Sequence, residues 1–209
     1  SSAAQPSSNT LPIVHPFGGT AVADDERYRH VARLLLARDE YEQITVVSAM
    51  KGVTDALIEL CGLASRSRGE WRDKWHELRA RHRGAVVSLL GESSGPTLEW
   101  LDERFDKLAE ILAALAVIGE LPSEVLDRVQ GLGEVCSARL LGDYLESLGE
   151  DCAVLDAREV LVVEHSDLGV VVDWDISGQR LAQWRAKNPQ RRVVVTGFIA
   201  RDHSERLTT

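Results

Sequence analysis

Two adjacent glycines, Gly18 and Gly19, end an apolar run near the start of the sequence. The run reads IVHPF, and a segment with helical spacing follows the glycines. Glycine lets the backbone approach a phosphate closely, and the first N–H groups of a following helix are free to bind an anion. The pattern therefore indicates a phosphate-binding turn, and a simple tight turn without a ligand is the alternative.

A second group of polar residues follows the next apolar run. The run ITVVSAM, residues 44–50, contains Ser48 and leads to Lys51 and Thr54. If both runs are parallel strands, their carboxyl ends meet at one edge of the sheet, where ligands bind in such folds. The three side chains would then lie beside the glycine turn. The alternative is that Ser48 and Thr54 cap a helix and that Lys51 lies in solvent.

A third candidate is the segment QGLGE, which runs from Gln130 to Glu134. It lies within a helical pattern that two glycines should weaken, so the glycines need a reason such as close packing or access to a ligand. With a ligand present, Glu134 could face a bound ammonium group. A packed helix crossing with Glu134 in solvent is the simpler interpretation.

The other polar residues favour structural roles. His76 and His82 are spaced to lie on different faces of a helix, which argues against a metal pair. The carboxylates of DDER and LDERFD are expected on solvated helix surfaces. The sequence has no H-E-x-x-H, G-x-S-x-G or Walker lysine motif. The cysteines lack metal or redox spacing and are expected to be reduced and buried; they are Cys61, Cys136 and Cys152.

Composition narrows the class of protein. The chain has 209 residues, 44% of them hydrophobic, and a net charge of -9. This charge argues against nucleic acid as a partner, because neutralising phosphates requires a surplus of lysine and arginine. No apolar segment is long enough to span a bilayer, so we expect no membrane partner and a cytoplasmic location. Residues 1–12 are polar and are expected to form a disordered arm.

The order of elements predicts an α/β fold. Strand-like and helical segments alternate at the start, and Thr54 is placed to cap the second helix. Long helical patterns follow, the last of them from Ser123 to Gly149 without a break. Strand-like runs then return, with a helix between them. We expect one open, mostly parallel sheet with helices on both faces and a helical insertion.

Four segments, in order, give the chain its resemblance to a known family. They read HPFGGTAVADDERY, VVSAMKGVTDALIEL, VQGLGEVCSARLL and LDAREVLVVE, and VVVTGFIARDHSERLTT adds a fifth. Together they resemble the N-terminal part of an aspartokinase, a member of the amino-acid kinase family. The chain looks most like the aspartokinase portion of bacterial bifunctional enzymes fused to diaminopimelate decarboxylase.

The resemblance implies transfer of the γ-phosphoryl group of ATP to the β-carboxylate of L-aspartate, the first step of lysine, threonine and methionine biosynthesis, with Mg-ATP as the family's cosubstrate. By similarity, three residues would line the phosphate loop and three would bind aspartate. The phosphate-loop residues are Gly18, Gly19 and Thr20. Ser48 and Thr54 would lie near the substrate aspartate. Thr54 would face one of its carboxylates, and Glu134 would face its amino group.

The sequence also departs from the family's first motif. Pro16 occupies the position of the motif lysine and Ala21 that of a serine, so a phosphate-neutralising cation is missing. The family's second glycine-rich loop would begin near Thr209. Residues 13–209 are therefore expected to form a substrate lobe, truncated before the nucleotide-binding half and inactive alone.

Two alternatives to a kinase lobe remain. The first is a non-catalytic aspartokinase-like protein that binds an amino acid or regulates a full-length kinase. The second is a generic nucleotide-binding α/β domain, which would bind ATP without a preference for aspartate. A half-built sheet would also expose an apolar edge, so we expect self-association or pairing with a full-length kinase.

Overall fold

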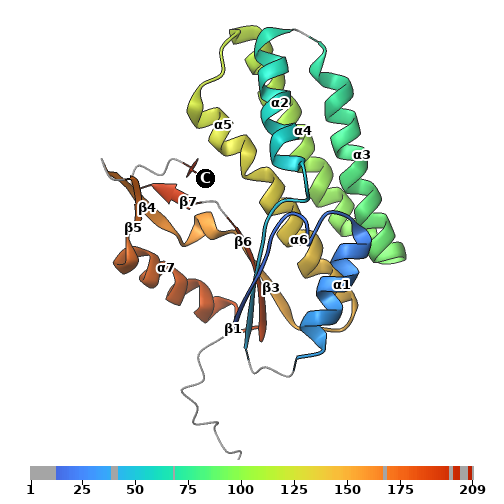
Figure 1. The fold of residues 1–209 in the computed structure, drawn as a ribbon, viewed down its shortest axis with the longest axis vertical. Coiled ribbons are helices and arrows are strands. Elements are labelled where there is room, and N and C mark those ends of the chain that lie inside the picture. Colours follow the sequence, from blue (N-terminus) through green and yellow to red (C-terminus); the bar gives the residue numbers. More distant parts are fainter. Residues whose placement is uncertain are drawn as a thin grey trace, which may run out of the picture.

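A computed structural model describes residues 13–38, 42–67, 69–166, 169–197, 200–202 and 207–208. The expected disordered arm, residues 1–12, lies outside the described residues. A parallel sheet and its flanking helices form the lower part of the molecule, and a group of long helices rises above it (Figure 1). None of the helices among the described residues is long and apolar enough to cross a membrane.

The main sheet has four parallel strands in the order β1-β2-β6-β3. Its strands are β1 (Ile13–Phe17), β2 (Gln43–Val47), β6 (Arg192–Thr196) and β3 (Cys152–Leu155). The central strands β2 and β6 are rich in β-branched residues and largely buried, as expected for a sheet covered on both faces. Pro16 lies on β1, at the edge, where a missing N–H costs no ladder bond on the open side. The expected mostly parallel sheet is confirmed.

A second, smaller sheet was not predicted. It has the order β5-β4-β7-β8 and mixes parallel and antiparallel pairs. Its strands are β4 (Val162–Ser166), β5 (Gly169–Val172), β7 (Ala200–Asp202) and β8 (Leu207–Thr208). The apolar run RRVVVTGFIA, residues 191–200, thus contributes to both sheets, through β6 and the start of β7.

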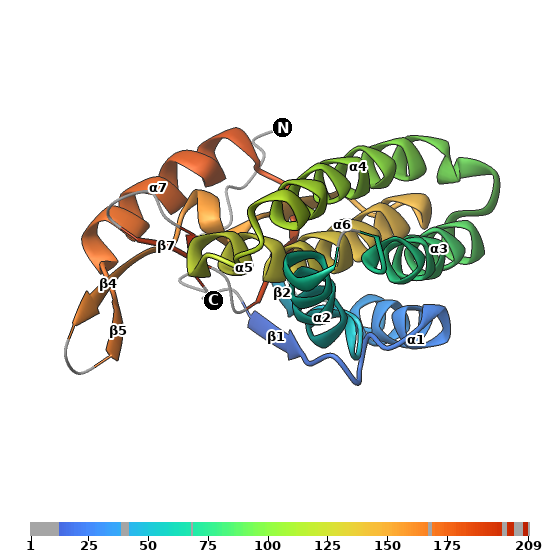
Figure 2. The same cartoon turned by 90° about the horizontal axis from the view of Figure 1, so that it is seen from above.

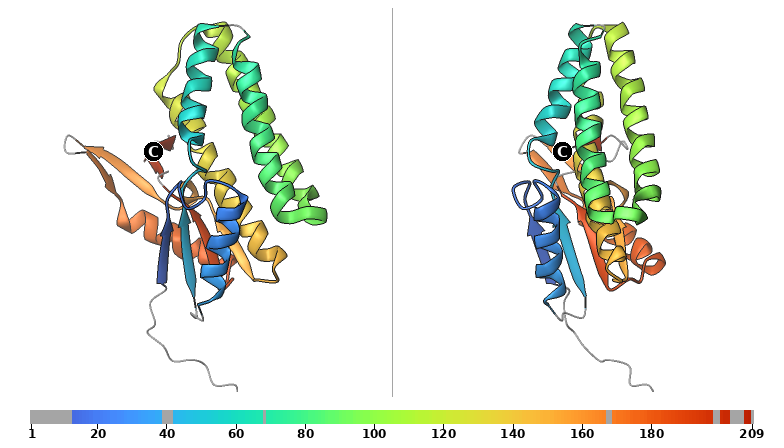
Figure 3. Two further views of the ribbon diagram at one scale, coloured as in Figure 1. Left: turned by 45° about the vertical axis from the view of Figure 1, so that its right-hand side comes forward. Right: turned by 90° about the vertical axis from the view of Figure 1, so that its right-hand side faces the viewer.

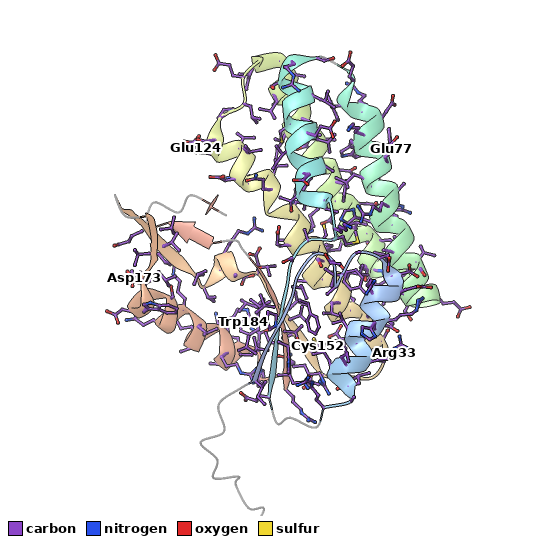
Figure 4. The ribbon with its side chains drawn as sticks, viewed as in Figure 1. Arg33, Glu77, Glu124, Cys152, Asp173 and Trp184 are labelled. Carbon is purple, nitrogen blue, oxygen red and sulfur yellow. The ribbon has the colours of Figure 1, made fainter. Side chains whose placement is uncertain are left out.

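Helices cover both faces of the main sheet, as predicted. On one face lie α1 (Asp25–Leu36) and α6 (Leu132–Ser147), and on the other lies α7 (Trp174–Lys187) (Figure 2). Alternation along β6 supplies both faces, because Val194 belongs to the main core whereas Val193 packs with Trp184 of α7. In Figure 4, Trp184 points from α7 towards the sheet.

The helical insertion consists of four helices that stand together above the sheet (Figure 3). They are α2 (Val53–Arg66), α3 (Trp71–Leu90), α4 (Gly95–Ile118) and α5 (Ser123–Gln130), and the short 3₁₀ segment η1 (Gly91–Ser94) links α3 to α4. A fully buried Phe105 lies at its centre, and its carbonyl accepts a 2.9 Å hydrogen bond from the indole of Trp75.

Two local predictions were wrong. The helix expected from Ser123 to Gly149 is broken at Gly131, which separates α5 from α6. Thr54 does not cap α2; the helix follows Gly52 and has no side-chain cap. The acidic segments lie on helix surfaces as expected, with Glu26, Glu103 and Asp106 exposed. Asp102 of α4 pairs with Arg79 and Arg83 of α3, because the insertion brings these helices side by side.

Candidate functional site

The candidate site lies where the parallel strands end. The backbone N–H of Ser48 donates to the carbonyl of Phe17 over 3.1 Å, and that of Gly197 donates to Val47 over 2.8 Å. These bonds continue the pairing of the three strands beyond their last residues. The loops after β1 and β2 therefore leave the sheet side by side, as parallel strands require.

Between these loops and the start of α6 lies an open cleft of about 450 Å³. It contains most of the residues predicted for the site, which come from three separate segments. The lining residues are Gly19, Thr20, Ser48, Ala49, Met50, Lys51, Gly52, Thr54, Asp55, Gln130 and Glu134. Of the six residues predicted for phosphate or substrate, only Gly18 is not among them.

The glycine turn approaches the second loop closely. A Cβ on Gly19 would lie 3.1 Å from the carbonyl oxygen of Ala49, tighter than most real contacts. A Cβ on Gly18 would meet no other atom within 4 Å, and the carbonyl of Gly18 accepts a 2.8 Å hydrogen bond from the N–H of Ala21. Gly19 is thus required for the close contact of the two loops, whereas Gly18 shapes the turn outside the cleft.

The N-terminus of α2 forms the second wall of the cleft. Gly52 has a φ of +79°, a conformation that disfavours side chains, and its geometry starts the helix. The first turn contains the half-buried Thr54, and Lys51 precedes it in an exposed position. The N–H of Val53 donates to the carbonyl of Met50 over 3.0 Å. The other N–H groups of the first turn, a hydroxyl and an ammonium group at this helix end can bind a carboxylate or a phosphate.

Glu134 closes the cleft from α6 and is not solvated, contrary to the simpler of the two sequence interpretations. The residue is 7% exposed, and its Oε2 has no hydrogen-bond partner among the described residues. Burial raises the pKa of Glu134, although the N–H groups of Glu134 and Ala49 and the charge of Arg158 act in the opposite direction. A buried carboxylate oxygen without a partner is suited to bind a cationic group.

Two polar residues of the cleft were missed by the sequence reasoning. Asp55 follows Thr54 in the first turn of α2, and Gln130 is the last residue of α5. The position of Asp55 next to Thr54 was a usable signal. Gln130 could be assigned only once the break at Gly131 was known, because that break directs the chain around the cleft.

The remaining candidates lie elsewhere. Pro16 pairs in register with Val46 and is not among the cleft residues. Its uncharged side chain also supplies no cation at the position of the motif lysine. Among the described residues, no group of three His, Cys, Asp or Glu side chains could hold a metal ion. His82 is buried and its Nδ1 lies 2.8 Å from the carbonyl of Leu78. The three cysteines are free and buried, as predicted.

The cleft has two chemically different ends. Glu134 supplies a carboxylate at the α6 side. The glycine turn and the N-terminus of α2 supply N–H donors at the other end, together with the ammonium group of Lys51 and the exposed carboxylate of Asp55. Such an arrangement can orient a small zwitterion by its ammonium group while leaving its carboxylate near a phosphate-binding turn.

Comparison with known proteins gives consistent results. Residues 12–209 match the model of the amino acid kinase family. A bifunctional aspartokinase/homoserine dehydrogenase 1 of Arabidopsis thaliana is 34% identical over 189 residues, which cover 90% of this chain and 21% of that protein. The bifunctional aspartokinase/homoserine dehydrogenase 2 of Escherichia coli is also 34% identical, over 91% of this chain and 23% of its own length.

Solved structures agree in fold. A crystal structure of Escherichia coli aspartokinase III in complex with aspartate and ADP superposes with a TM-score of 0.82 at 22% sequence identity. The match covers 96% of this chain and 43% of that chain. This chain spans about a fifth of the length of the two bifunctional relatives. Because the family model matches nearly the whole length of this chain, the chain belongs to the amino acid kinase family.

Proposed function

We propose that this chain is the substrate-binding lobe of an aspartokinase-type phosphotransferase, which transfers the γ-phosphoryl group of ATP to the β-carboxylate of L-aspartate. The observation that carries the proposal is the buried, unpartnered Oε2 of Glu134 in a cleft whose opposite wall is a helix N-terminus. The solved aspartokinase with the same fold holds aspartate and ADP, which supports the choice of ligands.

Glu134 binds the α-ammonium group of aspartate in this proposal. An isolated buried carboxylate is costly, and a bound cation offsets that cost through a charge-assisted hydrogen bond. The hydroxyl of Thr54 and the N–H groups that follow Val53 in the first turn of α2 then bind a carboxylate of the substrate, with Ser48 beside them. Recognition of both charges selects an amino acid over a simple dicarboxylic acid.

Gly18, Gly19 and Thr20 form the phosphate loop in the same proposal. The close contact of Gly19 with Ala49 leaves room for phosphate oxygens where a side chain would stand. Mg-ATP supplies the phosphoryl group, and magnesium bound mainly by phosphates and water is compatible with a lobe that has few carboxylate ligands. Lys51 is the lysine closest in sequence to this loop and lines the same cleft.

The finer assignments extend the same proposal. The reaction would be the first step of lysine, threonine and methionine biosynthesis, in the cytoplasm. Fusion to diaminopimelate decarboxylase stays a prediction, since the two relatives described above carry homoserine dehydrogenase instead. Residues 13–209 would form one lobe that is inactive alone. Exposed Ile13 and Val14 on edge strand β1 support self-association or pairing with a full-length kinase.

A non-catalytic amino-acid-binding role is the second candidate. It is favoured by Pro16, which has neither charge nor N–H where the family motif has lysine. Loss of such a cation costs on the order of a thousandfold in rate while leaving the amino-acid end of the cleft unchanged. Both candidates therefore require aspartate binding, and they differ in phosphoryl transfer.

Calorimetric titration with L-aspartate, with and without Mg-ATP, tests the proposal. We expect binding of L-aspartate, and loss of at least about tenfold in affinity for Glu134→Gln, since the amide cannot neutralise an ammonium group. The matched control is Glu124→Gln, which alters an exposed glutamate on neighbouring α5 (Figure 4). Succinate, which lacks the ammonium group, should bind weakly to both variants and to the wild type.

The outcomes separate the candidates. No binding of aspartate by the wild-type chain, or equal binding by Glu134→Gln, would exclude the proposed site. Aspartate binding with formation of aspartyl phosphate from ATP would overturn the prediction that the chain alone is inactive. Aspartate binding by the full-length natural protein without any phosphoryl transfer would favour the non-catalytic role.

A further inference from the structure

An arginine of the helical insertion joins the two loops that form the cleft. Arg81 of α3 uses a single terminal nitrogen, Nη2, for two hydrogen bonds to backbone carbonyls. One bond, of 3.0 Å, goes to Ala23, and the other, of 2.9 Å, goes to Lys51. An Nη group carries two hydrogens, so each hydrogen serves one loop.

The two carbonyls belong to the two neighbouring loops that contribute to the cleft. Ala23 ends the loop that begins with the glycine turn, immediately before Asp24 caps α1. Lys51 itself lines the cleft and directly precedes Gly52, where α2 starts. The distance between the glycine turn and the N-terminus of α2 is therefore set in part by a residue outside both.

A second connection keeps α3 in place against α1. Ser88 of α3 donates to the carboxylate of Asp25 over 2.5 Å, and Arg29 of α1 donates to the carbonyl of Ser88 over 2.5 Å. Figure 3 shows the lower part of α3 beside α1. With α3 held in this way, the guanidinium of Arg81 has a fixed origin from which it reaches both loops.

We propose that Arg81 is a positioning residue that holds the two loops of the cleft in their relative position by bridging them. The helical insertion is by this inference a part of the binding site, although no residue of α3 lines the cleft. The consequence for ligand affinity rests on the proposed function, whereas the consequence for loop order does not. A planar guanidinium suits the task because its donors have a fixed geometry.

Hydrogen–deuterium exchange of the 209-residue chain tests the bridge without any ligand. Arg81→Met removes both bonds and keeps an aliphatic side chain, so amides of both loops, residues 18–24 and 48–54, should exchange at least about fivefold faster. The matched control is Arg83→Met, on the same helix, which removes an ion pair with Asp102 of α4 and leaves the loops bridged. Arg81→Lys keeps the positive charge but lacks the planar guanidinium with its fixed donors, so the exchange rates of both loops should be intermediate.

The result that would overturn the inference is unchanged exchange in either loop of Arg81→Met, or equal acceleration in Arg83→Met. Wild-type exchange in Arg81→Lys would also overturn it, because charge alone would then suffice. Thermal unfolding of each variant by circular dichroism identifies general destabilisation, which would accelerate exchange throughout the chain rather than in two loops.

Calorimetry with L-aspartate gives the second arm. Arg81→Met should weaken binding roughly tenfold, whereas Arg83→Met should leave the affinity within about twofold of the wild type. If the wild-type chain does not bind aspartate, the proposed function fails while the exchange experiment still decides the bridge. If aspartate binds equally to wild type and Arg81→Met, the positioning role fails while the proposed function stands.

Discussion

Gly133 of α6 and Ala49 after β2 are in such close contact that a Cβ on Gly133 would fall 2.7 Å from the Cβ of Ala49. The next residue, Glu134, is thereby brought to the wall of the cleft opposite the glycine turn. A second glycine of α6, Gly142, packs against Val154 of β3 in the same manner. The two contacts hold α6 against the sheet and fix where its carboxylate lies.

Gly133→Ala is expected to lower the free energy of unfolding by about 1–2 kcal/mol. Overpacking at this contact costs more than the roughly 1 kcal/mol that alanine gains over glycine in a helix. Gly84→Ala, on an exposed part of α3 with nothing within 4 Å, is the matched control and should instead raise it by about 0.5–1 kcal/mol. Urea denaturation measures both, and equal effects of the two substitutions would show that the contact imposes no strain.

The stability of the protein should depend on the ionisation of Glu134. Burial raises the pKa of Glu134, so the folded state keeps this proton to a higher pH than the unfolded chain. The folded state then binds more protons, and the free energy of unfolding falls as pH rises between the two pKa values. Glu134→Gln lacks this penalty and should be more stable than wild type by roughly 1 kcal/mol at pH 8, without ligand.

Denaturation at pH 4 and pH 8, with and without L-aspartate, measures this effect. The advantage of Glu134→Gln should shrink at pH 4, where the carboxyl group is protonated more fully in both states. L-aspartate at a fixed concentration should stabilise the wild type more than the variant, which binds it more weakly. A variant less stable than wild type at pH 8 would contradict the assignment of an uncompensated buried charge.

His82 should cause the opposite dependence at lower pH. Burial lowers the pKa of His82 to about 4, where the ring packs against Phe105. The unfolded chain takes up a proton near pH 6.5 and the folded state does not, so this contribution is present above pH 6.5 and is lost as pH falls towards 4. The histidine should account for a loss of roughly 2 kcal/mol between pH 7 and pH 5.

Replacement of His82 by leucine should remove that part of the pH dependence. The matched control is His76→Leu, at an exposed position of the same helix, which should leave the slope of stability against pH unchanged. Denaturant midpoints at several pH values give the comparison. Equal slopes for wild type and His82→Leu would show that His82 is not buried in its neutral form.

A buried hydrogen bond joins α1 to α6. The hydroxyl groups of Tyr28 and Ser137 are 2.6 Å apart, and burial raises the pKa of Tyr28 well above its usual range. Tyr28→Phe and Ser137→Ala should each cost about 1–2 kcal/mol, because each leaves one buried hydroxyl without a partner. The double variant should cost about 1 kcal/mol less than the sum, in a cycle measured by denaturation. Full additivity would show that the two hydroxyls do not interact.

Much of the site could be predicted from local patterns. The apolar, β-branched runs predicted β1, β2 and β6, and the rule that parallel strands end at one edge placed Gly19, Ser48 and Thr54 together. The second sheet was missed because its strands are short and pair across distant parts of the chain. The break at Gly131 was missed because the apolar spacing continues through it.

The alternation of strands and helices at the start of the chain, the glycine turn and the family resemblance follow from sequence alone, because each depends on residues close to one another in the chain. Two features required the folded structure: Oε2 of Glu134 is buried without a hydrogen-bond partner among the described residues, and Arg81 bridges Ala23 and Lys51. Burial and bridging depend on which distant segments come into contact, and the spacing of residues along one helix carries no information about its neighbours. Local sequence therefore supplies the polar groups of the cleft. Long-range packing decides whether they are charged and how far apart they lie.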